Sequence, residues 1–148
     1  MSLANYQAKR KFKISPEPKG KVSKKNLHRF VVQEHHARNL HFDFRLELGG
    51  VLKSWAVPKG LADKKGIKRL AVQVEDHPVD YINFTGIIPV GEYGAGKVKI
   101  WDKGKFKIVE GDLAKGSIKL NLAGKKLKGD YILVRLKDKK NWIIYKHK

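Results

Sequence analysis

Hydrophobic residues recur at every second position in several short runs of this chain, which is the pattern of half-buried β-strands. The clearest run is Leu40–Leu48, where leucine and phenylalanine take the even-numbered positions. Ionisable residues take the odd-numbered positions: His41, Asp43, Arg45 and Glu47. Because successive side chains of a strand point to opposite faces, we expect one face to pack in a core and the other to carry these ionisable groups.

Similar runs continue to the end of the chain, separated by glycine, asparagine, aspartate and lysine. They predict strands at residues 29–34, 40–48, 51–57, 68–75, 84–88, 97–102, 105–110, 117–122, 130–136 and 141–146. Gly49-Gly50 predicts a hairpin turn, since both positions accept positive φ, and Asp102–Gly104 predicts another. No apolar stripe with helical spacing persists for three turns. We therefore expect an all-β fold, a β-barrel of about eight or more strands or a tightly curled sandwich, with short flanking helical or irregular segments.

The first 28 residues have a different texture, with few apolar positions, scattered lysines and the interruption Pro16-Glu17-Pro18. They predict a basic, flexible N-terminal arm over residues 1–28 that orders on a partner, followed by one β-barrel domain over residues 29–148. The segment GEYGAG at 91–96 is followed by a strand pattern rather than a helix. It therefore indicates a glycine-rich bend at a barrel corner, not a nucleotide-binding fingerprint.

Composition narrows the classes of function. The chain has no cysteine, which excludes disulfides, thiolate metal sites and cysteine nucleophiles. The pattern of a secretory signal is absent, and no apolar run approaches the ~20 residues of a membrane span. We expect a soluble protein of the cytoplasm.

The net charge of +19 is unevenly distributed. Residues 1–28 carry eight lysine or arginine residues against one acidic residue, residues 29–95 carry nine against eight, and residues 96–148 carry sixteen against five. Two basic flanks around a balanced centre favour a nucleic acid as partner, with lysine suited to phosphate contacts. The alternative is a solvated, lysine-rich surface.

The ionisable face of the 40–48 strand contains a candidate metal site. A hairpin whose first strand is 29–34 would bring His35 beside His41, so that two imidazoles and the carboxylate of Asp43 could meet at one ion. Arg45, next on the same face, carries a guanidinium that can bind a phosphate. Two histidines, one carboxylate and an arginine predict metal-assisted cleavage of phosphate esters.

A second group of functional candidates lies between Glu75 and Tyr81. His77, when protonated, could donate to a leaving alkoxide, and Tyr81 could orient a phosphate through its hydroxyl. Glu75 could hold a histidine tautomer. Lys59 and Arg69 could add positive charge at the rim. The alternative for Glu75 and Arg69 is an ordinary cross-strand ion pair.

Three long motifs carry a family resemblance: QEHHARNLHFDFRLELGGVLKSWAVPKG, RLAVQVEDHPVDY and FTGIIPVGEYGAG. Together they resemble the 3′-phosphoesterase module of bacterial DNA ligase D and its stand-alone bacterial and archaeal relatives. The resemblance implies a β-barrel with its active site on the outer surface. It also implies a manganese-dependent enzyme, with other divalent transition metals as options, that removes a 3′-terminal ribonucleoside by 2′-hydroxyl-dependent cleavage and then hydrolyses the remaining 3′-phosphate to a 3′-hydroxyl.

Carried over by position, the resemblance assigns roles to individual residues. The metal ligands are His35, His41 and Asp43, and the catalytic or phosphate-contacting residues are Arg45, His77 and Tyr81. Supporting positions are Gln33, Lys59, Arg69 and Glu75, with Arg10 and Glu17 serving chiefly the ribonucleoside-removing step. Lys11 stands where the family often has an aspartate, which predicts a weaker diesterase step and an intact monoesterase step.

The same resemblance sets the expected context. The substrates would be DNA or RNA-tipped DNA 3′ ends, at the nucleoid. The chain carries no polymerase or ligase module, so we expect it to act free-standing or to meet ligase, polymerase or Ku-like end-joining proteins in trans.

Two other functions remain open at this point. A non-haem iron oxygenase could use His41 and Asp43 with a distal His77, and it would depend on iron and oxygen. A non-catalytic nucleic-acid-binding barrel could stack bases on tryptophans, although we expect these three side chains in the core: Trp55, Trp101 and Trp142.

Overall fold

The computed structural model describes residues 3–10, 12, 15–18, 20, 22–23 and 26–147. It contains one short α-helix, α1 (Ala4–Ala8), and one 3₁₀ helix, η1 (Val79–Asn83). The strands are β1 (Arg29–His36), β2 (Leu40–Leu48), β3 (Val51–Val57), β4 (Arg69–Pro78), β5 (Gly86–Ile88), β6 (Gly96–Asp112), β7 (Ser117–Ala123), β8 (Lys128–Arg135) and β9 (Asn141–Lys146). Among the described residues, neither helix has the length and hydrophobicity needed to cross a lipid bilayer.

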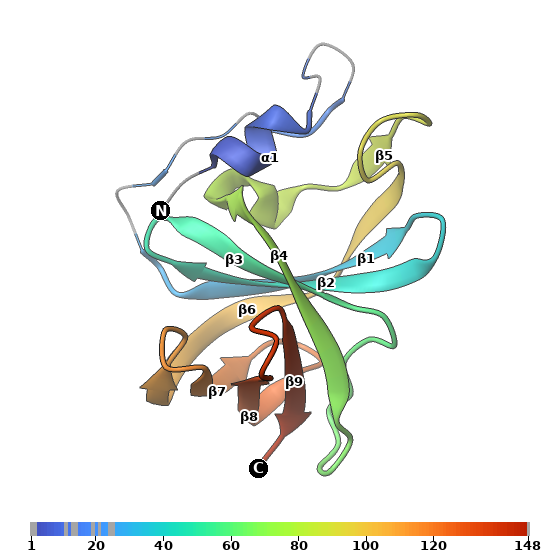
Figure 1. The fold of residues 1–148 in the computed structure, drawn as a ribbon. Helices are drawn as coiled ribbons and strands as arrows, with labels where there is room; N and C mark the ends of the chain where they lie inside the picture. Colours follow the sequence, from blue (N-terminus) through green and yellow to red (C-terminus); the bar gives the residue numbers. More distant parts are fainter. Residues whose placement is uncertain are drawn as a thin grey trace.

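The strands form a closed antiparallel barrel, as Figure 1 shows. Their order is β1-β2-β3-β4-β9-β8-β7-β6, and β1 pairs with β6 to close the ring. The short strand β5 pairs with the first three residues of β6, outside the ring of eight strands. The predicted all-β barrel is confirmed, and closure removes the free edges that an open sheet would expose.

The barrel interior is filled by the apolar side of the alternating strands. Phe44 and Leu46 of β2 point inward, with Trp55 of β3 and Trp142 of β9 packed edge to face at 5.6 Å between ring centroids. Trp55 and Trp142 are fully buried, as expected, and Trp101 packs partly against the same core. Burying each such side chain stabilises the fold by roughly 1.5–3 kcal/mol.

A second, smaller apolar layer covers one patch of the outer barrel surface. Val31, Leu52 and Val98 point outward from the barrel strands and meet side chains of η1, β5 and α1. Figure 1 shows these three elements together on the upper side of the barrel. The apolar patch itself is formed by β1, β3 and β6, and Arg45 of β2 lies 4.9 Å from the centre of the Tyr81 ring, so the ionisable row of β2 borders the covering elements.

The sequence predicted a flexible arm over residues 1–28, and the part of this arm that the structure describes packs against the barrel. Tyr6 of α1 is fully buried in the outer layer, and Ser15 and Glu17 are also buried. These buried residues are single positions among lysines, so the sequence of the arm shows no hydrophobic periodicity. Their packing partners lie on elements far along the chain, which a local pattern does not reveal. The domain boundary at residue 29 and ordering on a partner stay predictions.

The predicted turn at Asp102–Gly104 is wrong, because β6 runs unbroken through it. The Asp102 carboxylate accepts hydrogen bonds from the backbone N–H groups of residues 125–127 and so holds the neighbouring loop. A Cβ on Gly104 would lie 2.2 Å from the carbonyl oxygen of Ala123. Asp102 therefore holds the loop between β7 and β8, and Gly104 allows the close approach of β7 to β6.

The hairpins around β2 follow the sequence pattern. Gly49 and Gly50 have φ of 61° and 83°, which confirms the predicted turn between β2 and β3. Residues 37–39 connect β1 to β2, and His35 is paired directly with His41. β4 is longer than predicted and includes His77, so this histidine lies on a strand, directly before η1.

Candidate active site

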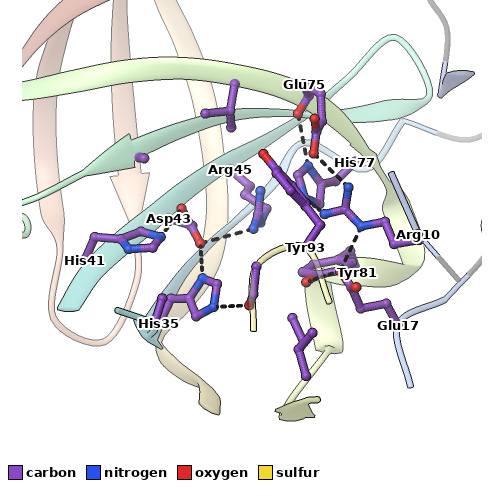
Figure 2. Close-up of a pocket in the computed structure, with 15 residues that line it drawn as sticks. Arg10, Glu17, His35, His41, Asp43, Arg45, Glu75, His77, Tyr81 and Tyr93 are labelled. Carbon is purple, nitrogen blue, oxygen red and sulfur yellow. Dashed lines mark hydrogen bonds and ion pairs between the residues drawn. The ribbon is translucent and has the colours of Figure 1, made fainter. Parts of the chain in front are cut away.

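Two histidines and an aspartate meet where β1 and β2 pair. His35 and His41 are cross-strand partners, and Asp43 follows two residues later on the same face of β2. Their ligand atoms all lie within 4.8 Å of one another, and Figure 2 shows them converging. Asp43 Oδ2 is 3.5 Å from His35 Nδ1, and Asp43 Oδ1 is 3.3 Å from His41 Nε2. The sequence prediction that these residues come together is confirmed.

Backbone carbonyls indicate which nitrogen of each imidazole carries the proton. His35 Nε2 lies 2.7 Å from the carbonyl oxygen of Gly94, and His41 Nδ1 lies 3.1 Å from that of Asn39. A carbonyl only accepts, so these nitrogens donate, and in the neutral rings His35 Nδ1 and His41 Nε2 keep lone pairs directed at Asp43. Lone pairs facing a carboxylate repel one another unless a cation lies between them. The donor set therefore fits a divalent metal ion.

The Asp43 carboxylate is held in its ionised form. Burial opposes ionisation, but Arg45 and then the two histidines hold the pKa of Asp43 far below its usual range. In the metal-free protein, Asp43 in turn raises the pKa of His41 through their hydrogen bond. A proton and a metal ion therefore compete for His41.

Arg45 lies beside the cluster with one nitrogen uncommitted. Its Nε donates to Gln33 Oε1 at 2.7 Å, and its Nη2 lies 3.4 Å from Asp43 Oδ2. Its Nη1 has no hydrogen-bond partner among the described residues, although the side chain is almost fully buried. A buried guanidinium nitrogen without a partner costs free energy, so this atom is a prepared donor for an anion.

Gln33 fixes the Arg45 guanidinium from behind. The Gln33 amide nitrogen donates to the carbonyl oxygens of Tyr81 (2.8 Å), in the middle of η1, and Phe84 (3.1 Å), directly after it. Its oxygen is thereby turned toward Arg45 Nε. The Arg45 guanidinium also lies 4.9 Å from the centre of the Tyr81 ring. Gln33 thus connects β1, β2 and η1.

His77 is buried and neutral in the structure. Its Nδ1 donates to the carbonyl oxygen of Glu75 at 3.0 Å, and Arg10 Nη2 donates to its Nε2 at 3.5 Å. Burial, followed by Arg45 and Arg10, lowers the pKa of His77 well below its usual value. In the protein without a bound anion, His77 is therefore disfavoured as a proton donor, and its predicted catalytic role stays a prediction.

The arm contributes an ion-pair network to the same site. Arg10 pairs with Glu17 at 3.1 Å and with Glu75 at 2.8 Å, and Lys9 also pairs with Glu75. The Tyr81 hydroxyl donates to Glu17 at 2.8 Å, and burial raises the Tyr81 pKa, so the hydroxyl keeps its proton. Glu75 is thus paired with the arm. Lys11 lies outside the described residues.

These groups surround one cavity of about 240 Å³. Figure 2 shows the polar side chains that line it: Arg10, Glu17, His35, His41, Asp43, Arg45, Glu75, His77, Tyr81 and Tyr93. Gln33 stands behind Arg45. Of the predicted site residues, Lys59 and Arg69 are not among the described residues that line it; Lys59 is exposed in the loop after β3, and Arg69 pairs with Ile144 at the start of β4.

Sequence reasoning missed two residues of the loop before β6. Tyr93 lines the cavity and stacks against Lys9 and Arg10, and Gly94 holds His35 through its carbonyl oxygen. The available signal was the GEYGAG segment, interpreted only as a bend. A backbone acceptor leaves no trace in side-chain chemistry, so Gly94 could not be identified from residue type.

Comparison with known proteins identifies a family. The family described as the DNA ligase D 3′-phosphoesterase domain matches residues 33–135. The multifunctional non-homologous end joining protein LigD of Pseudomonas aeruginosa is 49% identical over 155 residues, which cover 99% of this chain and 18% of that protein. Its counterpart from Mycolicibacterium smegmatis is 46% identical over 157 residues, covering 99% and 20%.

A third relative extends the comparison to another genus. The multifunctional non-homologous end joining DNA repair protein LigD of Mycobacterium tuberculosis is 47% identical over 137 residues, which cover 90% of this chain and 18% of that protein. The chain therefore spans about a fifth of the length of the curated relatives it matches. With the family match over most of its length and these identities, the chain belongs to the DNA ligase D 3′-phosphoesterase domain family.

Proposed function

We propose that this protein is a metal-dependent phosphoesterase that processes the 3′ ends of DNA. The observation that carries the proposal is the pairing of two features in one cavity. Three donor atoms of His35, His41 and Asp43 converge, and the unpartnered Nη1 of Arg45 lies beside them. A cation site next to a buried anion donor suits a phosphate group.

The residues fit a divalent ion held by two imidazoles and one carboxylate. We propose Mn²⁺, supported by the family to which the chain belongs, with other divalent transition metals as options. When bound, the ion would act as a Lewis acid toward phosphoryl oxygens. The carbonyls of Gly94 and Asn39 would keep the ligand nitrogens free of protons.

Arg45 is proposed to bind the phosphate through Nη1. Its Nε is already fixed by Gln33, so the guanidinium is oriented before the substrate arrives. The positive charge would compensate the charge that spreads over the non-bridging oxygens as the ester bond breaks. Donors placed in advance are worth ~10²–10³ in rate.

His77 is proposed to take a proton only when a phosphate occupies the cavity. Burial and then the positive charges of Arg45 and Arg10 hold its pKa down, and a phosphate dianion would offset the two charges. Protonated at Nε2, His77 could then donate to the departing alkoxide. Tyr81, which keeps its proton, could donate to a phosphate oxygen in place of Glu17.

We propose two reactions at this site, removal of a 3′-terminal ribonucleoside and hydrolysis of a 3′-phosphate. Arg10, Glu17 and Glu75 form one wall of the cavity beside His77, where a leaving nucleoside could be held. Lys11 in place of an aspartate predicts a weaker ribonucleoside-removing step. Ligase, polymerase or Ku-like proteins are proposed partners in trans at the nucleoid, in keeping with the end-joining names of the relatives.

The iron oxygenase alternative depends on His77 as a metal ligand. Among the described residues, the group that could hold a metal contains His35 instead, and His77 contacts Arg10. The non-catalytic alternative needs exposed tryptophans, but Trp55 and Trp142 are buried in the barrel core and Trp101 packs partly against it. The iron oxygenase alternative gives no role to the uncommitted nitrogen of Arg45, and the non-catalytic alternative gives none to the three converging metal-ligand atoms.

The test uses a 5′-labelled primer-template that ends in a 3′-phosphate or in one ribonucleotide. With Mn²⁺ present, we expect conversion to a 3′-hydroxyl end, none with EDTA, and the ribonucleotide end processed more slowly. Substrate affinity should fall steeply with salt as lysine-phosphate contacts release counterions. Absence of product from the 3′-phosphate primer with Mn²⁺, Co²⁺ and Zn²⁺ alike would refute the proposed function.

A further inference from the structure

The hairpin formed by β5 and β6 ends in an exposed apolar tip, which is separate from the two apolar layers. We call Ile87, Val90 and Tyr93 the hairpin tip. Val90 is 99% exposed, Ile87 is 66% exposed and Tyr93 is 48% exposed. A single exposed apolar residue is ordinary, but three within seven positions beside a functional cavity call for a partner.

The hairpin tip is held in a fixed place. Ile87 pairs with Lys97 across the hairpin, and Ile88 is buried in the outer apolar layer. Within the loop, Glu92 N donates to the carbonyl of Pro89 and Ala95 N donates to the carbonyl of Glu92, both at 3.1 Å. Figure 1 shows β5 and this loop standing out from the barrel on the side of α1 and η1. The exposed side chains are thus presented by an ordered element.

The tip stands directly beside the metal cluster. Gly94, in the same loop, binds His35, and Ile88 and Tyr93 line the cavity. Val90 follows Ile88 by two residues, so their Cα atoms are at most about 7 Å apart. A nucleotide adjacent to a phosphate in the cavity would therefore lie within reach of the tip.

The charges around the tip match a nucleic-acid strand. Lys97 and Lys99 of β6 are exposed, although Glu34 lies opposite Lys99 and Glu92 lies in the loop. Lys9 of the arm, which pairs with Glu75, is also exposed and lies over the Tyr93 ring. Apolar side chains flanked by lysines fit bases flanked by backbone phosphates, because bases offer stacking faces and phosphates offer negative charge. A membrane or an apolar protein surface could also bind the apolar residues, but it would not account for the lysines that flank them.

We infer that the hairpin tip packs against the nucleobases of the last nucleotides at a DNA 3′ end. The inference rests on the proposed function for the position of the terminal phosphate. The tip holds the bases while the lysines hold the backbone. Its contribution is to substrate binding, because the group of described residues that could hold a metal consists of His35, His41 and Asp43 and includes no member of the tip.

The test combines the double variant Ile87→Ser/Val90→Ser with two primers that end in 3′-phosphate. One primer has ordinary bases, and the other is abasic at its last two positions. For the ordinary primer, we expect the variant to raise KM about tenfold with kcat unchanged, because the apolar contacts of Ile87 and Val90 with the bases are lost. For the abasic primer, wild type and variant should have equal KM. Val109→Ser, which alters a half-exposed valine toward the opposite end of β6, should change neither.

Equal KM for wild type and double variant on the ordinary primer, or an equal loss on both primers, would overturn the inference. Fluorescence anisotropy of labelled primers in EDTA measures the same comparison without turnover. If wild type hydrolyses neither primer, the proposed function fails, and the anisotropy still decides whether the tip binds bases. A variant that instead loses self-association in sedimentation, with DNA binding intact, would assign the tip to a second copy of the chain.

Discussion

Two carboxylates in the outward row of β2, Glu47 and Asp43, each pair with a guanidinium group, Arg29 of β1 or Arg45 of β2, and the two pairs differ in how completely they are satisfied. At one end, Glu47 accepts from Arg29 Nε at 2.8 Å, from Arg29 Nη2 at 3.1 Å and from its backbone N at 3.2 Å. At the other end, Asp43 is 3.4 Å from Arg45, whose Nη1 is unpartnered among the described residues. In the first pair, Arg29 and Glu47 satisfy each other by hydrogen bonds. In the second pair, both Asp43 and Arg45 line a cavity and can bind a further partner there.

The comparison shows that buried charge alone does not mark a functional site. Both carboxylates are buried on one strand face, and for both an arginine lowers the pKa against the effect of burial. They differ in the remaining neighbours, because Asp43 also faces two imidazole nitrogens with lone pairs. Atoms left without a protein partner, rather than ionisation, indicate where an ion and an anion would bind.

The largest difference between the two pairs should appear when each carboxylate is replaced by its amide. Asp43→Asn should abolish hydrolysis of the 3′-phosphate primer, since the amide is a poor metal ligand. Glu47→Gln should retain near-normal activity but lower the free energy of unfolding by about 1–3 kcal/mol, because charged hydrogen bonds to Arg29 weaken. Activity assays, Mn²⁺ titration calorimetry and urea unfolding of both variants measure this. Near-normal turnover by Asp43→Asn would remove it from the ligand set.

Exchanging the two arginines for lysine is the next test. Arg45→Lys should lower kcat by ~10²–10³ while Mn²⁺ affinity is retained, because the ammonium cannot serve both Gln33 and the phosphate. Arg29→Lys, the matched change in the first pair, should leave kcat within about twofold of wild type. If instead Arg45→Lys loses Mn²⁺ binding at unchanged kcat under saturating metal, Arg45 organises the cluster and does not act on substrate.

Gln33 has a smaller expected effect, because it acts through Arg45. Gln33→Leu should lower kcat about tenfold and destabilise the fold by about 1–3 kcal/mol, as two carbonyls and Arg45 Nε lose their partners. Gln33→Glu keeps an acceptor for Arg45 and should recover part of kcat but not the stability. Steady-state kinetics and urea unfolding distinguish the two effects. Equal kcat for both variants would show that Gln33 does not orient Arg45.

The smallest effect is a pH dependence of stability. Native His77 resists protonation, whereas the unfolded chain gains this proton below about pH 6.5, so stability falls with falling pH by up to about 1.4 kcal/mol per unit. His77→Gln should flatten this slope in urea unfolding between pH 5 and 6.5 in EDTA. The raised pKa of His41 stabilises the fold at low pH, and this contribution is lost as pH rises above that range. It is the same in wild type and in His77→Gln, so it does not affect the comparison. Parallel curves would contradict a neutral, buried His77.

The metal cluster could be predicted from sequence because it is local. A hairpin fixes register, and the alternation of β2 places His41 and Asp43 on one face, so only the pairing with His35 had to be inferred. The contacts of Arg10 and Glu17 could not be predicted in this way. They join an irregular arm to β4 and η1, more than 60 positions away in the sequence, and no periodicity carries that information.

The two errors in the strand assignment also have physical reasons. Asp102 and Gly104 look like a turn because these residue types favour turns, but here they support a loop and admit a close backbone approach. The strand β4 extends past its predicted end at Glu75 to Pro78, with a register shift against β3 that a regular alternation does not reveal. Local preference was overridden by contacts between strands in both cases.

The main-chain carbonyls that orient the two imidazoles have an evolutionary consequence. At position 39, any amino acid supplies the same oxygen, so the side chain is free to drift without disturbing His41. At position 94 the oxygen is equally generic, but the backbone adopts a φ of 74°, which opposes a side chain. The two carbonyl oxygens bind the histidines in the same way, but the two positions should tolerate substitution very unequally. Position 39 should accept any residue type, whereas position 94 should accept only glycine.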